Sequence, residues 1–349
     1  MTRDELIEQV RHGEPITGVD LSGMDLSGAD LSGGVFQEVR FASAKFAGAA
    51  LREAIFAGCS FEGADLRKAE LPRAVLDHSS LDRATLEGAD LTGAKWHACS
   101  ASGVTLRQAR LALGVFSEVN LTGADLSGTL LDRTAFFQGS WGQVNLSGAT
   151  LKQTVLNEAD LRTVNLTGAS FELALLLQSN LSGMNLQGMR FTLTQFNGAN
   201  LSGCDLRDSV LVQCGFKDAD LSGAKMEKAN AANALFIQAR AAGANFRQAN
   251  LFQALLLDAE LGKADFSGAN LQQAQFARAK CAGARFIGAE LTYTDFSHAD
   301  LSAADFTRAT LERTQFHGAL ERGTVGRSPV GALGTDEKRA QAENWRPTH

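Results

Sequence analysis

The sequence has no large excess of charge of either sign. Its 33 Lys and Arg residues stand against 39 Asp and Glu residues, which gives a formal net charge of -6 over 349 residues. Domains that bind nucleic acid carry a basic patch or stripe, and this composition provides none. We therefore expect no direct contact with DNA or RNA.

Long apolar runs are also missing. The run Leu173–Leu177 is far shorter than the roughly 20 residues that a bilayer-spanning helix needs. The amino terminus carries Asp4 and Glu5 where a secretory signal would be basic and then apolar. The sequence thus predicts a cytoplasmic protein that makes no membrane contact.

Cysteine is scarce, and motifs that carry chemistry are absent. The five cysteines are odd in number and form no CxxC pair, so neither a disulfide framework nor a zinc site is indicated. No phosphate-binding glycine loop, nucleophile elbow or HExxH motif occurs. We expect no catalytic, cofactor-binding or metal-binding residues and no enzyme activity.

Two histidine pairs repeat one spacing. His78 and His97 are nineteen residues apart, and so are His298 and His317. In the coil described below, this spacing would bring each pair together on adjacent turns. Two imidazoles alone are too few for a convincing metal site, so we interpret them as surface histidines.

What the sequence does contain is one five-residue repeat. From Leu21 to Phe316 a core-type residue stands at every fifth position, sixty times without a change of register. These central residues are Leu or Phe except for Trp96, Ala101, Trp141, Met226, Ala231, Ala241 and Cys281. The residue two places earlier is always small or uncharged, so both positions are predicted to face inward.

A period of five matches neither the helix nor the simple strand. A chain that turns a right angle every five residues, however, closes a square coil after twenty. Coils stacked about 4.8 Å apart would pair their backbone groups with the coils above and below. Sixty units would give about fifteen coils in one elongated domain, because each repeat contacts only its neighbours.

The recurring tripeptide Ala-Asp/Asn-Leu carries a family resemblance. It is seen at Ala29-Asp30-Leu31, Ala124-Asp125-Leu126 and Ala269-Asn270-Leu271, among many other places. This pattern resembles that of the pentapeptide repeat proteins. The resemblance implies an all-β solenoid, a right-handed quadrilateral parallel β-helix, whereas the periodicity alone gives the square coil without its hand.

The ends of the chain leave the repeat. The predicted domains are an N-terminal capping helix at 1–15, the β-helix at 16–320 and a flexible C-terminal tail at 321–349. Thr2 and Glu5 stand at capping-box spacing, and Pro15 ends the helical pattern. The tail is glycine-rich and then charged, which favours disorder. Trp345 could serve as a docking residue or fold back over the last coil near Phe316.

Outward positions differ among the four predicted sides. Two sides are polar, and on one of them Asn145, Asn165 and Asn185 should stack as an amide ladder. The other two share a corner and carry apolar residues just outside the core. Strand propensity alone would enrich all sides alike, whereas exposed apolar patches usually mark contact surfaces. The predicted partner-binding residues are Val115, Phe137, Val155, Leu173, Leu175, Leu177, Leu235, Ile237, Leu255, Leu257 and Trp345.

These features predict a non-enzymatic scaffold or adaptor that binds protein partners. The opening segments Asp4-Glu5-Leu6 and Leu21-Ser22-Gly23-Met24-Asp25-Leu26 resemble pentapeptide proteins that accompany bacterial type VI secretion, which implies an accessory role there. With no C-terminal cap visible in the sequence, the last coil near Phe316 could also support an end-to-end homodimer.

The alternative function is DNA mimicry. Quinolone-resistance members of the family are similar to duplex DNA in shape and charge, which implies binding to DNA gyrase or another topoisomerase. The net charge of -6 gives this chain a much lower density of negative charge than duplex DNA, which carries about one charge per 1.7 Å of helix axis. The projecting loops and the carboxy-terminal dimerisation helix of those relatives are also missing from this sequence.

Overall fold

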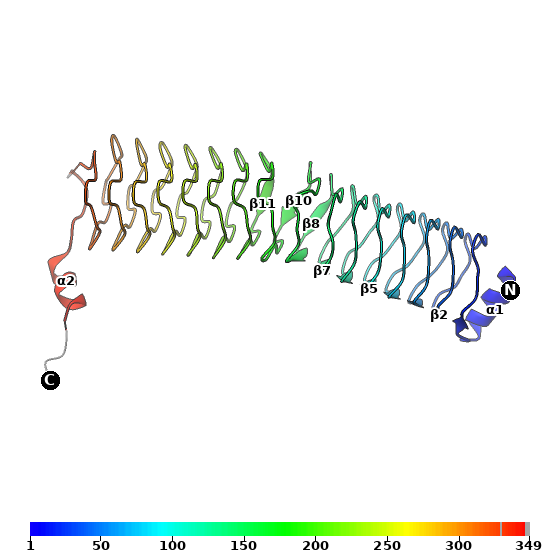
Figure 1. Ribbon diagram of the computed structural model, residues 1–349. Coiled ribbons are helices and arrows are strands. Elements are labelled where there is room, and N and C mark those ends of the chain that lie inside the picture. Colours follow the sequence, from blue (N-terminus) through cyan, green and yellow to red (C-terminus); the bar gives the residue numbers. More distant parts are fainter. Residues whose placement is uncertain (329, 346–349) are drawn as a thin grey trace. The chain divides into compact units, whose positions relative to one another are not determined.

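The computed structural model describes residues 1–328 and 330–345, and the predictions for 329 and 346–349 lie outside these ranges. The chain forms two compact units, Met1–Ser179 and Asn180–His349. Each unit is a stack of turns in an all-β parallel solenoid with short helices (Figure 1). Neither helix in the described ranges is long and apolar enough to cross a bilayer.

The regular elements are short. The helices are α1 (Arg3–Arg11) and α2 (Glu337–Glu343). The strands of the first unit are β1 (Ile16–Thr17), β2 (Val35–Gln37), β3 (Ile55–Ala57), β4 (Val75–Asp77), β5 (Lys95–His97), β6 (Val115–Ser117), β7 (Ala135–Phe137), β8 (Thr150–Lys152), β9 (Val155–Asn157) and β10 (Ser170–Glu172). The second unit holds β11 (Arg190–Thr192).

Pairing between turns is parallel and follows the predicted register of twenty residues. Phe36 of β2 pairs with Phe56 of β3, which pairs with Leu76 of β4. The same offset continues in the second unit through isolated bridges such as Leu235 to Leu255. Each paired strand therefore places its core residue directly over that of the turn before.

Extended strands are fewer than the repeat predicts. They mark about nine turns rather than fifteen. Beyond β11, single-residue bridges link residues twenty apart, as at Asp220 to Arg240 and Asn250 to Asn270. The length of the repeat unit does not cause this difference, because β2 to β7 are three-residue strands built from the same five-residue unit.

The predicted central positions are buried, whereas a few residues two places before a centre, such as Met184 and Met189, are half-buried. Phe36 and Phe56 stack with ring centroids 5.0 Å apart, and Trp96 packs edge-on against Phe116 at 5.2 Å. All five cysteines are buried free thiols at inward positions of the repeat. Burial raises the pKa of the Cys214 thiol to about 12.

Hydroxyl side chains are tolerated inside because the neighbouring turn supplies an acceptor. Thr134 Oγ1 donates to the carbonyl of Leu111 at 2.8 Å, and Thr294 Oγ1 donates to the carbonyl of Leu271 at 2.7 Å. Both hydroxyls are fully buried. A buried polar group that finds a partner avoids most of its desolvation cost.

The recurring Asp before each central residue closes the turn that follows. Asp30 Oδ1 accepts the backbone N–H of Ser32 at 3.1 Å, and Asp300 Oδ1 accepts that of Ser302 at 3.0 Å. These hydrogen bonds lower the pKa of both carboxyl groups below the ordinary value. The next residue has a left-handed backbone, as at Gly33 with φ 70°, which explains the recurring glycine.

The N-terminal helix is confirmed. The N–H of Glu5 donates to Thr2 Oγ1 at 3.3 Å, and the N–H of Thr2 donates to Glu5 Oε2 at 2.7 Å, which completes the predicted capping box. Leu6 is fully buried, and Arg3 donates to the carbonyl of Ser27 at 3.0 Å. Helix α1 therefore packs against the first turns.

The prediction of a flexible tail is wrong for the part of the tail that pairs with the last turn. The N–H of Phe316 donates to the carbonyl of Leu333 at 2.9 Å. The guanidinium of Arg327 lies 4.3 Å from the centre of the Phe316 ring, which is 1% exposed. The tail thus covers the last core residue, because its backbone still reaches the open edge.

Helix α2 is the second correction to the tail. Its N-cap residue, Asp336, accepts the backbone N–H groups of Lys338 at 2.9 Å and Arg339 at 3.1 Å. Trp345 follows the helix and is 73% exposed, so it does not fold back over Phe316.

Candidate protein-binding surface

The residues just before the core positions form columns on the outside of each unit. In the first unit one column consists of Val35, Ile55, Val75, Lys95, Val115, Ala135, Val155 and Leu175. Alternation along each strand sends the following residue into the core, so this column must lie outside. Lys95 is its only charged member.

The first patch comprises the predicted residues of this unit: Val115, Phe137, Val155, Leu173, Leu175 and Leu177. Val115, Phe137 and Leu173 each expose 38% of their surface, and the other three are half-buried. Val155 bridges to Leu175 on the next turn. The intervening Leu176 is fully buried, so the predicted division between inward and outward positions is confirmed here.

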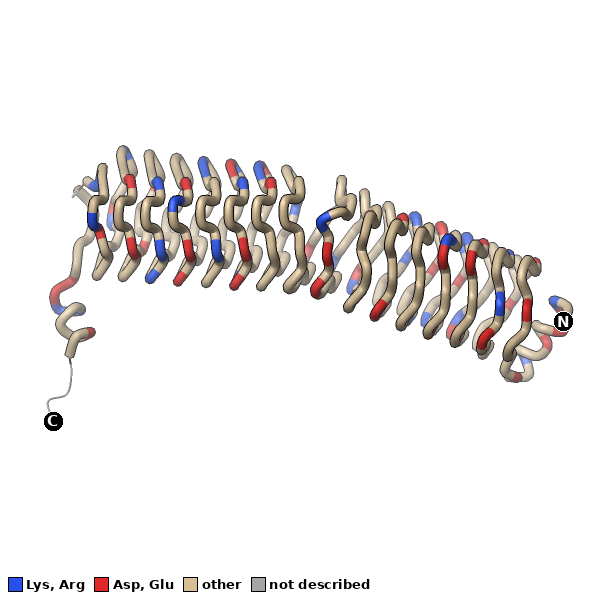
Figure 2. Tube along the Cα trace, viewed as in Figure 1, with Lys and Arg blue, Asp and Glu red and all other residues tan. Residues whose placement is uncertain are grey.

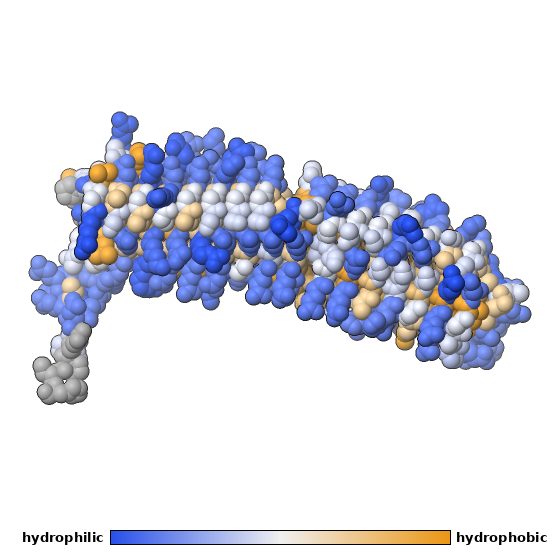
Figure 3. All heavy atoms as spheres, viewed as in Figure 1, coloured by the Kyte–Doolittle hydropathy of each residue, from blue (hydrophilic) through white to orange (hydrophobic). Residues whose placement is uncertain are grey.

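The second patch comprises Leu235, Ile237, Leu255 and Leu257 in the second unit. Leu235 bridges to Leu255 and is 36% exposed, while the other three are half-buried. Gly215 and Gln275 continue the column on either side and end the apolar stretch. On the face shown in Figure 3, side chains of near-neutral hydropathy form a narrow row along this unit between hydrophilic rows, and the strong orange of leucine and isoleucine is not gathered there.

A shallow groove adjoins the apolar column of the first unit. It encloses about 630 Å³ and is lined by Pro72, Arg73, Val75, Thr92, Gly93, Lys95 and Leu113. Leu113 is 53% exposed. Arg73 is ion-paired with Glu53. An apolar floor beside cationic groups is suited to an apolar side chain that neighbours a carboxylate.

Charged columns of the second unit are paired within the chain. The ion pairs include Arg240 with Asp220 at 3.1 Å, Lys280 with Glu260 at 2.8 Å and Arg278 with Asp258 at 2.7 Å. The hydrogen bond from Lys280 lowers the pKa of Glu260. Figure 2 shows basic and acidic positions interleaved along the turns. These charges largely neutralise one another.

Amide ladders complete the polar sides. Asn165 Nδ2 donates to Asn145 Oδ1 at 3.0 Å, which confirms that part of the predicted ladder. A second ladder, which we did not predict, runs through Asn230, Asn250 and Asn270, with amide hydrogen bonds of 3.0 and 3.1 Å. Stacked Asn at a spacing of twenty is the signal that could have identified it.

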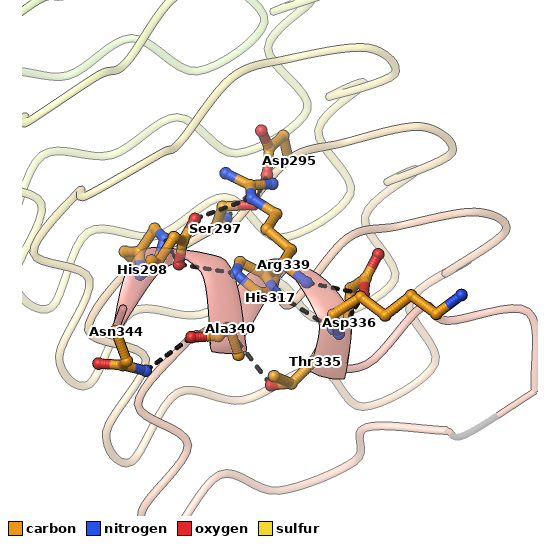
Figure 4. A network of polar contacts seen from close by, with 12 residues as sticks. Asp295, Ser297, His298, His317, Thr335, Asp336, Arg339, Ala340 and Asn344 are labelled. Carbon is orange, nitrogen blue, oxygen red and sulfur yellow. Dashed lines mark hydrogen bonds and ion pairs between the residues drawn. The ribbon is translucent and has the colours of Figure 1, made fainter. Parts of the chain in front are cut away.

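Both histidine pairs meet on adjacent turns, as predicted, but the interpretation as surface histidines is wrong for His317, which is buried beside helix α2. The ring centroids of His78 and His97 are 5.5 Å apart, and those of His298 and His317 are 5.2 Å apart. Each pair also has a neighbouring carboxylate, from Asp77 and Glu343 respectively. Figure 4 shows the second pair beside helix α2.

Several exposed apolar residues escaped the sequence interpretation. Tyr293 is 47% exposed, and the guanidinium of Arg313 lies 5.7 Å from its ring centre. Near the C-terminal end of the second unit, Leu320, Val325 and Leu333 are 51–53% exposed. The five-residue period ends near Phe316, so it carries no information about the tail residues.

Comparison with known families gives two matches. A family model described as pentapeptide repeats (8 copies) matches residues 35–71, 59–95, 98–136, 145–176, 174–211 and 284–320. A second model, described as a pentapeptide repeat region, matches residues 209–286. No curated protein matches the chain.

Several solved structures are similar to the chain. HetL, a pentapeptide repeat protein involved in heterocyst differentiation regulation from the cyanobacterium Nostoc, is 26% identical over 77% of this chain and 87% of its own, with a TM-score of 0.22. The plasmid-mediated fluoroquinolone resistance protein QnrB1 is 16% identical over 77% and 92%, with a TM-score of 0.21. A pentapeptide repeat protein of the Arabidopsis thaliana thylakoid lumen is 31% identical over 32% and 68%, with a TM-score of 0.15. Scores this low carry no argument about function.

Proposed function

Because the chain belongs to the pentapeptide repeat family, we propose that it is a non-enzymatic scaffold that binds a protein partner through the first and second patches. One observation carries this proposal: charged and amide columns pair within the chain, whereas the apolar columns keep more than a third of Val115, Leu173 and Leu235 exposed. A partner surface could remove that area from water.

The chemistry of the groove narrows the kind of partner. Val75 and Leu113 offer apolar contact, and Lys95 adds a positive charge beside them. We expect the partner to present an apolar side chain next to a carboxylate at this point. Its complementary charge would orient the docking more than it would strengthen it.

A cross-linking and capture experiment tests the proposal. The full chain would be compared with the double variant Leu175→Asp/Leu255→Asp, which places one charge in each patch. We expect the bound protein to be lost from the variant, because an unpaired charge in a desolvated interface weakens binding at least tenfold.

The control is Ala242→Asp, which adds one such charge at an exposed position of the second unit outside the patch. This variant should retain the partner. Circular dichroism should show the same fold for all three proteins. Equal capture by the double variant and the control would contradict binding through the patches.

The type VI secretion role implied by the opening segments remains a prediction. It requires the protein lost from the double variant to be a spike, adaptor or effector of that system. Mass spectrometry of the captured protein checks this directly, and a partner from another pathway would remove the secretion role without affecting the scaffold.

DNA mimicry remains the alternative. A mimic needs rows of unpaired negative charge, whereas Asp220, Glu260 and Asp258 lie in ion pairs. A supercoiling assay separates the two functions. Inhibition or protection of gyrase by the purified chain would favour mimicry over the scaffold.

We also infer that the coil is four-sided and right-handed. Four bridges repeat in each register of twenty, as at Asp20, Asp25, Asp30 and Val35, which supports four sides. The hand follows from the family alone. A crystal structure with triangular turns or a left-handed coil would contradict this inference.

End-to-end association remains a prediction, although its original reason has gone because Arg327 covers Phe316. Its remaining support is the exposure of Leu320, Val325 and Leu333 near the C-terminal end of the second unit. Light scattering at several concentrations should detect a dimer, and the variant Val325→Asp should remain monomeric. A monomer throughout would exclude the association.

A further inference from the structure

The two histidine clusters are close copies of each other in geometry. The rings of His78 and His97 are inclined at 83°, and those of His298 and His317 at 88°. In each cluster one carboxylate lies beside the two imidazoles, and the three donor atoms lie within 4.8 Å of one another. The clusters differ in the hydrogen-bond partners of their imidazole nitrogen atoms.

The first cluster stands on paired backbone. Asp77 ends β4 and His97 ends β5, and the two residues are direct partners in the parallel ladder. His78 follows Asp77, and its backbone N–H donates to the carbonyl of His97 at 3.0 Å. All three positions are therefore fixed by hydrogen bonds between the two turns.

The side chains of the first cluster remain accessible. Both imidazoles are exposed and Asp77 is half-buried. His78 Nδ1 lies 3.0 Å from Asp77 Oδ1, so these two groups already point toward one another. Small side-chain rotations would bring the three donors to about 2.0–2.2 Å from a common ion, the distance that zinc takes from imidazole and carboxylate ligands.

We propose that Asp77, His78 and His97 bind one divalent transition-metal ion of the zinc type. Two imidazoles and a carboxylate suit such ions better than they suit calcium or magnesium, which take oxygen ligands. Three protein ligands leave a fourth position for water or another donor. This site is independent of the protein-binding function proposed above.

The second cluster is engaged differently. The backbone N–H of Asp336 donates to His317 Nδ1 at 3.1 Å, so the proton of the neutral ring must be on Nε2. His317 Nε2 in turn lies 3.0 Å from Glu343 Oε2 and donates to it. A metal-bound histidine would instead use one nitrogen for the ion and donate from the other.

His317 therefore holds helix α2 rather than an ion. Glu343 is also bound by Arg339, whose Nε donates to Oε1 at 2.9 Å (Figure 4). A metal ion bound at His317 Nε2 would move the ring proton to Nδ1. Nδ1 could then no longer accept the backbone N–H of Asp336, so that hydrogen bond would be lost. The second cluster thus serves as an internal control for the first.

Zinc titration of the full chain tests the assignment. After treatment with a chelator, isothermal titration calorimetry with zinc chloride should find one ion per chain. His97→Ala should weaken binding at least about tenfold, because even residues that only support metal ligands typically contribute 10- to 100-fold. Asp77→Asn, which keeps the side-chain shape, should weaken it as well.

The matched control is His298→Ala, which should leave both affinity and stoichiometry unchanged. Substitution of cobalt for zinc gives an independent readout, since its visible absorption should appear with wild type and His298→Ala and be lost with His97→Ala. Absence of zinc binding, or binding that His298→Ala weakens and His97→Ala spares, would overturn the proposal.

Discussion

Two columns of the second unit share one backbone geometry and differ in what their side chains meet. Asp220, Arg240 and Glu260 follow one another at a spacing of twenty, and so do Leu235 and Leu255. In the first column opposite charges meet on adjacent turns. In the second, leucine covers leucine only in part, and Leu235 stays 36% exposed. The fold thus tolerates charged or apolar side chains on its outer surface. The charged column is paired within the chain, whereas the apolar column remains partly exposed to solvent.

The largest expected effect comes from moving a charge across the wall of the coil. Leu256 is fully buried and its neighbour Leu255 is half-buried. Leu256→Asp should lower the free energy of unfolding by at least about 4 kcal/mol, because it leaves both a cavity and a buried carboxylate. Leu255→Asp should change it by about 1 kcal/mol or less.

Urea denaturation followed by circular dichroism measures both values. Similar losses of stability in the two variants would break the distinction between lining and outer wall on which the comparison of columns depends.

Acid should act on the polar sides and spare the apolar columns. Hydrogen bonds lower the pKa values of Asp30, Asp205 and Asp300. The largest contributions come from Ser32, Arg207 and Ser302 respectively. The unfolded chain therefore binds protons more readily, so this stabilisation is complete above about pH 5 and is lost as pH falls through the unfolded-state value and then the lower folded-state values.

We expect a melting temperature that is nearly constant from pH 7 to about pH 5 and falls steadily below about pH 4. The triple variant with Asn at these three positions keeps the side-chain acceptor and removes the charge. Its acid slope should be shallower. An unchanged slope would show that these carboxylates do not link folding to pH.

The central repeat could be predicted because five-residue spacing fixes which residues face inward. Leu176 and Leu256 are buried, and Leu175 and Leu255 lie outside, as expected. Spacing also brought His78 to His97, since nineteen is one turn less one residue. The inward or outward direction of a residue and its neighbours on adjacent turns depend on its position in the repeat, whichever outward side chain is present.

The ends could not be predicted in the same way. Arg327 covers Phe316, and Glu343 reaches His317, through contacts that no period marks. The sequence carried a partial signal for α2 in Asp336 followed by good helix formers. The docking of this helix depends on side-chain geometry that becomes visible only in the folded chain.

The amide ladder offers a smaller test of the polar sides. Asn250 donates to Asn230 at 3.0 Å, accepts from Asn270 at 3.1 Å and accepts the backbone N–H of Phe252 at 3.3 Å. Asn250→Ala should cost about 1–3 kcal/mol, since it leaves partners unsatisfied. Asn250→Asp keeps the acceptor and should cost less. Equal losses in urea denaturation would contradict a role for the acceptor.

The smallest expected effect on stability comes from converting one column into the other. Glu260→Leu/Lys280→Leu replaces an exposed ion pair, worth about 0–1 kcal/mol, with stacked leucines. Stability should therefore change by about 1 kcal/mol or less, while light scattering should reveal self-association that Glu260→Gln/Lys280→Gln does not cause. If the leucine variant stays monomeric, an outward apolar column is not sufficient for association. Binding of a partner by the patches would then also require the groove beside Lys95.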